Sequence, residues 1–110
     1  MKKYELRFTP SARDDLHSIE GYIAQDHPIP AHKMRERIAA KAEELAIFPG
    51  RGKSASLLGY FQPEMRFVAE GKYYIFYKVS GDQVIVYSIV HSARDIGRLL
   101  TLLDFDEQDQ

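Results

Sequence analysis

The chain has 110 residues and no cysteine, and its composition bounds both its size class and its chemistry. A chain of this length forms one domain, and 45% hydrophobic with 12% aromatic residues is typical of a folded globular protein. The absence of cysteine excludes disulfides and thiolate metal sites, and it suits the reducing cytoplasm. No apolar run is long enough for a membrane span or follows the N-terminal lysines as in a signal peptide, so we expect neither.

Charge is unevenly distributed along the chain. The net charge is −1, but residues 104–110 contain four acids and no base. Without this segment 15 basic and 12 acidic residues remain, so residues 1–103 carry a net charge of +3. Dedicated readers of nucleic-acid phosphates usually show a stronger basic stripe. We therefore expect one domain over residues 1–103, followed by an acidic, disordered tail at residues 104–110.

The N-terminal half predicts one strand followed by a helical hairpin. Residues 4–8 alternate between apolar and charged side chains, which is the pattern of a half-buried strand. Thr9 can cap a helix and Pro10 suits its first position, so we expect a helix over about residues 10–25. A second helix is expected from Pro30 to just before the segment FPGRG. The apolar faces of the two helices contain Ala12, Leu16, Ile19 and Ile23, and Met34, Ile38, Ala42 and Leu45.

The C-terminal half predicts three strands after one long loop. Residues 49–64 contain three glycines and two prolines, and long loops in small domains are often functional. Strands are expected at residues 65–69, 72–79 and 83–91, with short glycine-containing turns between them, so neighbouring strands should form antiparallel hairpins. A short helix is expected near residues 94–103.

These elements define an α+β fold with one mostly antiparallel sheet. The N-terminal strand, the helical hairpin and the three-stranded meander bury all their apolar stripes if the hairpin covers one face of the sheet. The first strand is expected to pair with a later one. In the last strand, alternation places His91 on the same face as Ile85, Tyr87 and Ile89.

Four segments in this order resemble the ParE/RelE superfamily of type II toxin–antitoxin toxins, and its ParE branch in particular. They read FTPSARDDLHSIEGYIAQDHP, LAIFPGRGK, RFVAEGKYYIFYKV and VIVYSIVHSARD, and the likeness extends from residue 4 to about residue 100. The resemblance implies the β-α-α-β-β-β fold and a small growth-inhibiting toxin without a cofactor. It also implies a cognate ParD-like antitoxin and a hetero-oligomer of two toxins with two or more antitoxins.

The two branches of the superfamily differ in function. RelE-like members cut mRNA on the ribosome, whereas ParE-like members poison DNA gyrase. RNA cleavage through the 2′-hydroxyl needs a base, cations and an acid. By the resemblance, a phosphate-binding arginine of the ribonucleases corresponds to Tyr74, a second arginine to Arg94 and the C-terminal tyrosine to Leu100. Other polar positions of the ribonucleases fall at or near Ser54, Ala55, Met65 and Phe67.

We therefore expect no catalytic site in this chain. If the chain is a ribonuclease, its residues are Arg66, His91 and Arg94. The expected role of His91 is to bond a backbone group or Asp95 at the end of its strand, and Arg94 is expected to pair with a carboxylate or with the cap of the last helix. The remaining histidines show no ligand spacing, so no metal site is predicted.

The leading hypothesis is a toxin that inhibits DNA gyrase by binding and is neutralised by its antitoxin. A segment of the antitoxin that folds on binding is expected in a groove between the helical hairpin and the sheet. The expected groove residues are Leu16, Ile19, Ile23, Met34 and Ile38. Candidates for the contact with the target are Arg51, Lys53, Arg66, Arg94 and Arg98. The alternatives are a ribosome-dependent mRNA ribonuclease and an inactivated toxin kept as an antitoxin partner.

Overall fold

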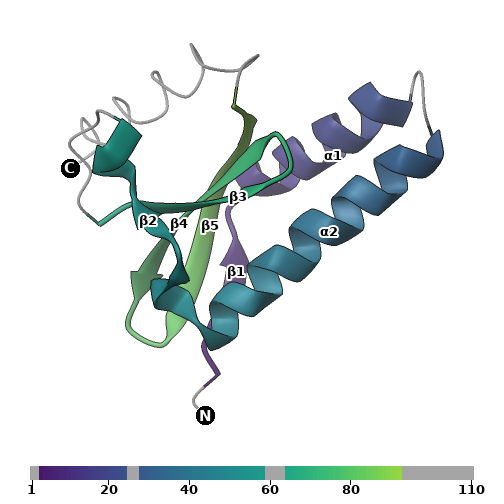
Figure 1. The fold of residues 1–110 in the computed structure, drawn as a ribbon. Coiled ribbons are helices and arrows are strands. Elements are labelled where there is room, and N and C mark those ends of the chain that lie inside the picture. The colour runs from purple at the N-terminus through teal and green to yellow at the C-terminus, as the bar shows by residue number, and fades with distance from the viewer. Residues whose placement is uncertain (1–2, 25–27, 59–63, 93–110) are drawn as a thin grey trace.

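The computed structural model of the protein describes residues 3–24, 28–58 and 64–92, which form an α+β fold. A hairpin of two helices lies on one face of a five-stranded sheet (Figure 1). The strand order is β1-β5-β4-β3-β2, and all neighbours are antiparallel except β1 and β5, which are parallel. The elements are β1 (Glu5–Phe8), α1 (Pro10–Ala24), α2 (Pro28–Ile47), β2 (Lys53–Ser54), β3 (Arg66–Glu70), β4 (Tyr73–Ser80) and β5 (Gln83–His91).

The predicted order of elements is confirmed, with two corrections. Helix α2 begins at Pro28 and not at Pro30, because a proline is tolerated throughout the first turn, where backbone N–H groups have no intrahelical partner. The segment predicted as one long loop contains the two-residue strand β2 between the 3₁₀ helices η1 (Pro49–Arg51) and η2 (Ala55–Leu58). The helix predicted near residues 94–103 and the predicted tail lie outside the described residues. No helix in the described part of the chain is long and apolar enough to cross a membrane.

Two tight turns produce the meander of β3, β4 and β5. Glu70 pairs with Tyr73 across the first turn, so its loop contains two residues. Gly71 begins this loop with φ of 59°, and Gly81 begins the second loop with φ of 58°. A positive φ at the first loop residue matches the type II′ turn that two-residue hairpins use, and glycine adopts it without strain.

Hydrogen bonds of Thr9 connect the start of α1 to β5. The Ala12 N–H donates to Thr9 Oγ1 at 3.1 Å, so Thr9 is the predicted N-cap. Thr9 also donates from its N–H to the Val86 carbonyl at 3.0 Å and from its hydroxyl to the Tyr87 carbonyl at 3.0 Å. One residue therefore ends β1, begins α1 and holds both to the middle of β5.

A β-bulge lies at the same point of β5. Phe76 of β4 pairs with Ser88, but the next residue of β4 pairs with Val86, which leaves Tyr87 without a partner on β4. Just past the bulge, the Ile89 N–H donates to the buried carboxylate of Asp15, with 2.8 Å between N and Oδ2. The Ile89 N–H faces away from β4, and β1 ends opposite Val86, so Asp15 supplies an acceptor where no strand of the described chain lies beside β5.

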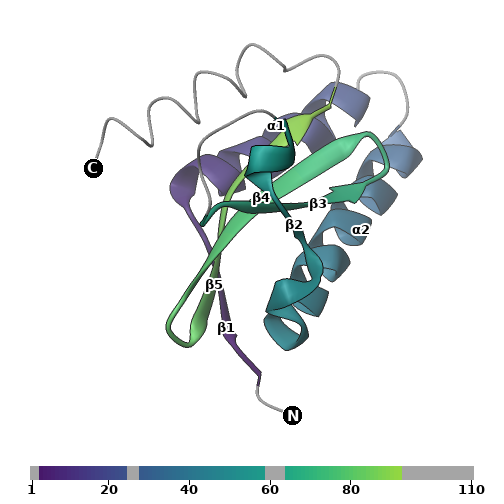
Figure 2. The same cartoon turned by 60° about the vertical axis from the view of Figure 1, so that its left-hand side comes forward.

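The two faces of the sheet are covered differently (Figure 2). The face beneath the helices contains the larger core cluster, in which Ile38 of α2 and Tyr77 of β4 are completely buried. The opposite face carries a second cluster, which we call the aromatic cluster. It consists of Ala55, Met65, Phe76 and Val90, with the half-buried Phe67, Tyr74 and Tyr87 packed against them.

Candidate functional site

His91 lies at the end of β5 on the helix-facing side of the sheet. Its ring is half-buried and meets the Tyr73 ring edge-on, with 5.3 Å between centroids and 87° between planes. Ile85 and Tyr87 were predicted to share a face of the strand with His91. This prediction is wrong, because the bulge at Tyr87 reverses the alternation of side chains. Ile89 is correctly placed, since it belongs to the core cluster beneath the helices.

Arg66 binds the backbone of the segment that precedes β2. Its Nη1 donates to the Gly52 carbonyl at 2.7 Å. The hydroxyl of Tyr77 accepts a hydrogen bond from the Gly52 N–H at 2.9 Å and donates to the Pro49 carbonyl at 2.7 Å. These bonds hold residues 49–52 against the end of the sheet. The guanidinium of Arg66 is thus used in fixing the backbone.

The Tyr77 hydroxyl makes this part of the fold sensitive to alkaline pH. Burial raises the pKa of Tyr77 above its ordinary value of 10.0. The Gly52 hydrogen bond and the Arg66 charge lower this pKa, but by less than burial raises it. Because the folded chain binds this proton more tightly, the stabilisation is complete below pH 10.0 and is lost as pH rises through the raised pKa.

Tyr77→Phe is expected to lower the free energy of unfolding at pH 7 by about 1–3 kcal/mol, because Gly52 N–H and the Pro49 carbonyl lose their partner. It should also reduce the alkaline loss of stability. Urea unfolding of both proteins from pH 7 to about pH 11 measures the two effects. An equal alkaline loss in the variant would contradict the role of this phenol.

Arg66 and His91 lie at opposite ends of the segment in which β3 and β4 pair. Arg66 is opposite Tyr77 of β4, whereas His91 is opposite Tyr73. Four residues of extended strand separate these positions, which corresponds to about 13 Å along β4. Groups that act on one phosphate must all lie within hydrogen-bond reach of it. The described structure therefore does not bring these two ribonuclease candidates together, and the third, Arg94, lies outside the described residues.

Four of the positions that correspond to ribonuclease groups, Ala55, Met65, Phe67 and Tyr74, lie in the aromatic cluster. The Tyr74 ring packs edge-on against Phe67 at 5.2 Å and Phe76 at 6.1 Å between centroids. Ala55 is completely buried, and Met65 is 3% exposed. Apolar groups packed in this way neither transfer protons nor neutralise phosphate charge. Within the three described ranges, no three His, Asp or Glu side chains gather as metal ligands would.

The predicted antitoxin groove is filled by the protein's own core. Ile19 is 8% exposed and Ile38 is completely buried, so both pack between the helices and the sheet. Leu16 and Met34 are half-buried at the margin of this core. The side chain of Ile23 lies outside the described residues.

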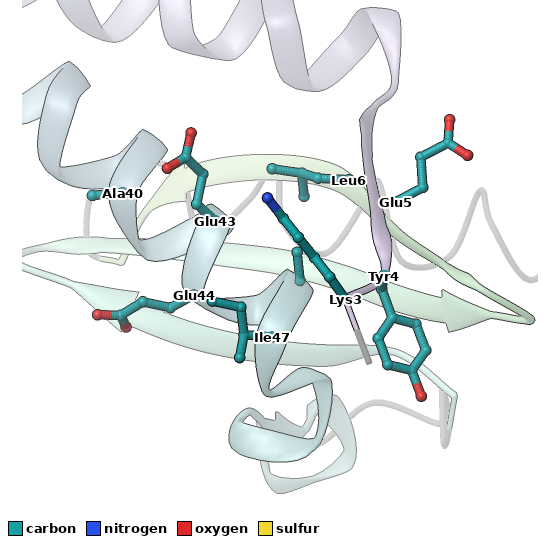
Figure 3. A pocket seen from close by; sticks show the side chains of 9 residues that line it. Lys3, Tyr4, Glu5, Leu6, Ala40, Glu43, Glu44 and Ile47 are labelled. Atoms are coloured by element: carbon teal, nitrogen blue, oxygen red, sulfur yellow. The ribbon is translucent and has the colours of Figure 1, made fainter. Parts of the chain in front are cut away.

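An open groove of about 780 Å³ lies instead between β1 and the C-terminal half of α2. In Figure 3 the side chains of Lys3 and Leu6 extend toward α2, whereas Glu5 points to the other side of β1. Glu43 and Ile47 form part of the opposite wall. The sequence pattern did not predict this groove, because it depends on how the end of α2 crosses the start of β1.

Two of the predicted target-binding cations lie together at the other edge of the sheet. Arg51 and Lys53 line a cleft of about 270 Å³ with Lys41 of α2, and its remaining wall is the backbone and side chains of β3 at residues 67–69. We call this the cationic cleft. Lys41 was not predicted as a site residue. Arg94 and Arg98 lie outside the described residues.

Comparison with known proteins identifies the family. The model of the ParE toxin of the type II toxin–antitoxin system parDE matches residues 6–96. The chain belongs to the ParE toxin family. The predicted resemblance is confirmed, and this ParE-family chain is a type II toxin–antitoxin toxin. No curated protein sequence matches it significantly.

Solved structures share the fold of this ParE-family chain. A chain of the chromosomal ParDE toxin–antitoxin system from P. aeruginosa superimposes with a TM-score of 0.70 at 18% identity, covering 83% of this chain and 98% of that chain. A chain of the RelBE2 toxin–antitoxin complex from Mycobacterium tuberculosis gives a TM-score of 0.62 at 24% identity, covering 83% and 93%. At these identities the likeness shows the fold alone, and the predicted α+β class is confirmed.

Proposed function

We propose that this ParE-family toxin inhibits DNA gyrase by binding to it and does not cleave RNA. The aromatic cluster carries the proposal, because it contains four of the positions at or near which the ribonuclease branch is expected to keep polar groups: Ala55, Met65, Phe67 and Tyr74. Removing even one charge-stabilising group from a transition state costs about 10²–10³ in rate. The separation of Arg66 from His91 along β4 further supports a binding role.

The partner that neutralises the toxin is a ParD-like antitoxin in our proposal, and the two form a hetero-oligomer in the cytoplasm. The similar solved chains come from a ParDE system and a RelBE2 complex, which supports an antitoxin partner. Leu16 and Met34 are half-buried and offer the antitoxin an apolar contact, while Ile19 and Ile38 support them from within. A segment that folds on binding suits such a partly exposed apolar margin.

The contact with gyrase uses exposed cations in this proposal. Arg51 is exposed and donates to Glu44 at 3.1 Å, and Lys53 is exposed on β2. Arg66 has a lesser part, because its guanidinium bonds the Gly52 carbonyl. Arg94 and Arg98 remain candidates from the sequence.

Expression of the chain without an antitoxin in a bacterium tests the proposal. Gyrase inhibition predicts filamentation and a DNA-damage response before any fall in translation. Ribonuclease action predicts rapid loss of mRNA and an immediate halt in translation. Normal growth with full-length folded protein would favour the inactivated toxin.

His91→Ala is expected to leave toxicity unchanged within about twofold, because a binding toxin needs no proton transfer at this position. The variant loses one edge-on ring contact with Tyr73, worth about 0.5–1.5 kcal/mol of stability. Growth is measured over a series of inducer concentrations, with protein level and thermal unfolding as controls. Loss of toxicity in a folded variant at normal level would support an acid–base role for His91.

A further inference from the structure

The outer edge of β3 is only partly covered. Lys53 pairs with Phe67 and Ser54 with Arg66, and the Ala55 N–H donates to the Met65 carbonyl at 2.8 Å. Backbone groups alternate in direction along a strand, so those of residues 65, 67 and 69 point outward from β3. Strand β2 ends at Lys53, opposite residue 67. The N–H and carbonyl of Ala69 therefore face outward beyond the end of β2, with no strand beside them in the described part of the chain.

This uncovered edge forms one wall of the cationic cleft. Lys41 comes from α2, Arg51 from η1 and Lys53 from β2, while Phe67, Val68 and Ala69 supply the apolar wall. The only acid bound to these cations among the described residues is Glu44, which lies 3.4 Å from Lys41 and 3.1 Å from Arg51. Three cations against one carboxylate leave the cleft with an excess of positive charge, so it favours an anionic occupant.

A neighbouring ion pair borders the cationic cleft. Arg37 of α2 donates to the carboxylate of Glu70 at the end of β3, with 2.7 Å between Nη2 and Oε2. This pair neutralises itself and links the two elements at the end of the open edge.

The shape of the cleft favours a peptide over a nucleic acid. An outward-facing strand edge binds another extended backbone, and alternate side chains of that backbone point to opposite sides. Lys53 shares a face of the sheet with its strand partner Phe67, whereas Val68 lies on the opposite, helix-facing side. Acidic side chains on one side of the bound segment would therefore meet Lys53, while apolar side chains on the other would meet Val68. A nucleic-acid backbone gains most from a long basic stripe, which a volume of about 270 Å³ does not provide.

We propose that the cationic cleft docks an extended segment of a partner protein in which acidic and apolar residues alternate, pairing with β3 at Ala69. The inference rests on the proposed function only for the identity of the partner, which would be the antitoxin. The same chemistry exists in residues 104–110 of this chain, which contain four acids. The test therefore separates a partner segment from the chain's own tail.

The probe is a fluorescent, amidated peptide of four Asp-Val repeats, and the protein is the full chain made by cell-free synthesis. Binding is followed by fluorescence anisotropy at two salt concentrations. We expect binding that weakens with salt, and no binding of the matching Lys-Val peptide. The exchange of the Ala69 amide hydrogen should slow by about tenfold or more on saturation, because its N–H becomes paired. No binding of the Asp-Val peptide, or tighter binding of an eight-nucleotide oligothymidylate, would overturn the proposal.

Two charge reversals and one matched control locate the site. Lys41→Glu and Lys53→Glu are each expected to weaken binding by about tenfold, because each replaces an attraction by a repulsion. Arg7→Glu makes the same charge change on exposed β1, at the opposite edge of the sheet, and should leave binding unchanged within about twofold. If peptide binding weakened equally in all three variants, the effect would come from the net charge of the protein alone. That result would overturn the assignment of the site to the cationic cleft.

A full-length variant with an uncharged tail shows whether the cationic cleft binds a partner segment or the chain's own residues 104–110. In it Asp104, Asp106 and Asp109 become Asn and Glu107 becomes Gln. Unchanged affinity for the probe supports a partner segment, whereas affinity increased by about tenfold would assign the cleft to the chain's own tail. These measurements contain no gyrase, so peptide binding can succeed where gyrase inhibition fails, and the reverse.

Discussion

Gly52→Ala is expected to lower the free energy of unfolding by about 3 kcal/mol or more. A Cβ atom on Gly52 would lie against the hydroxyl and Cε1 of Tyr77 and 2.9 Å from the Phe67 carbonyl oxygen. These atoms belong to a buried tyrosine side chain and to a strand backbone, neither of which can move aside freely. The substitution therefore displaces Tyr77 and breaks its bonds to residues 49 and 52.

Gly50→Ala is the matched control for this substitution. No heavy atom lies within 4 Å of a Cβ at Gly50. Its effect on stability should stay within about 0.5 kcal/mol, as for an ordinary surface change. Urea unfolding of the two variants and the parent chain measures both values. Equal stabilities of the two variants would contradict the tight packing of Tyr77 against Gly52.

Asp15→Ala has the second large expected effect, a loss of about 2–3 kcal/mol. Asp15 is 5% exposed, and its carboxylate accepts the hydrogen bond of Ile89 N–H beside the β5 bulge. Without it a buried N–H remains unpaired in the core. Asp15→Asn keeps one acceptor oxygen and should lose less.

The neighbouring carboxylate provides the control for Asp15. Asp14 lies on the exposed side of α1, one residue earlier, so Asp14→Ala removes the same charge from the same helix. It should change stability by less than about 0.5 kcal/mol. Hydrogen exchange at Ile89 distinguishes a local from a global effect, since the amide should lose protection selectively in Asp15→Ala. Similar losses for Asp14→Ala and Asp15→Ala would reject this role.

Local patterns predicted most of the elements, because periodicity and capping act over a few residues. Thr9 and Pro10 marked the start of α1, and the alternation in residues 83–91 marked β5. The Asp15–Ile89 hydrogen bond could not be read from the sequence, since its partners lie 74 residues apart. Strand β2 has two residues and is too short to show a period.

The candidate sites were less predictable than the fold, because surfaces depend on which elements meet. Of the residues predicted to line an antitoxin groove, Ile19 and Ile38 are covered by the protein itself. Arg51 and Lys53 lie close in sequence and were named together, whereas Lys41 joins them only through the packing of α2 beside β3. The Asp15 and Thr9 contacts also show that the segment TPSARDD has a structural role.

The most direct test of a binding mechanism is the supercoiling of a relaxed plasmid by purified gyrase in the presence of the refolded chain, with ribosome-bound mRNA incubated in parallel. We expect supercoiling to be inhibited by the parent chain and by His91→Ala alike, while the mRNA stays intact. Unaffected gyrase together with cleaved mRNA would contradict the proposed function.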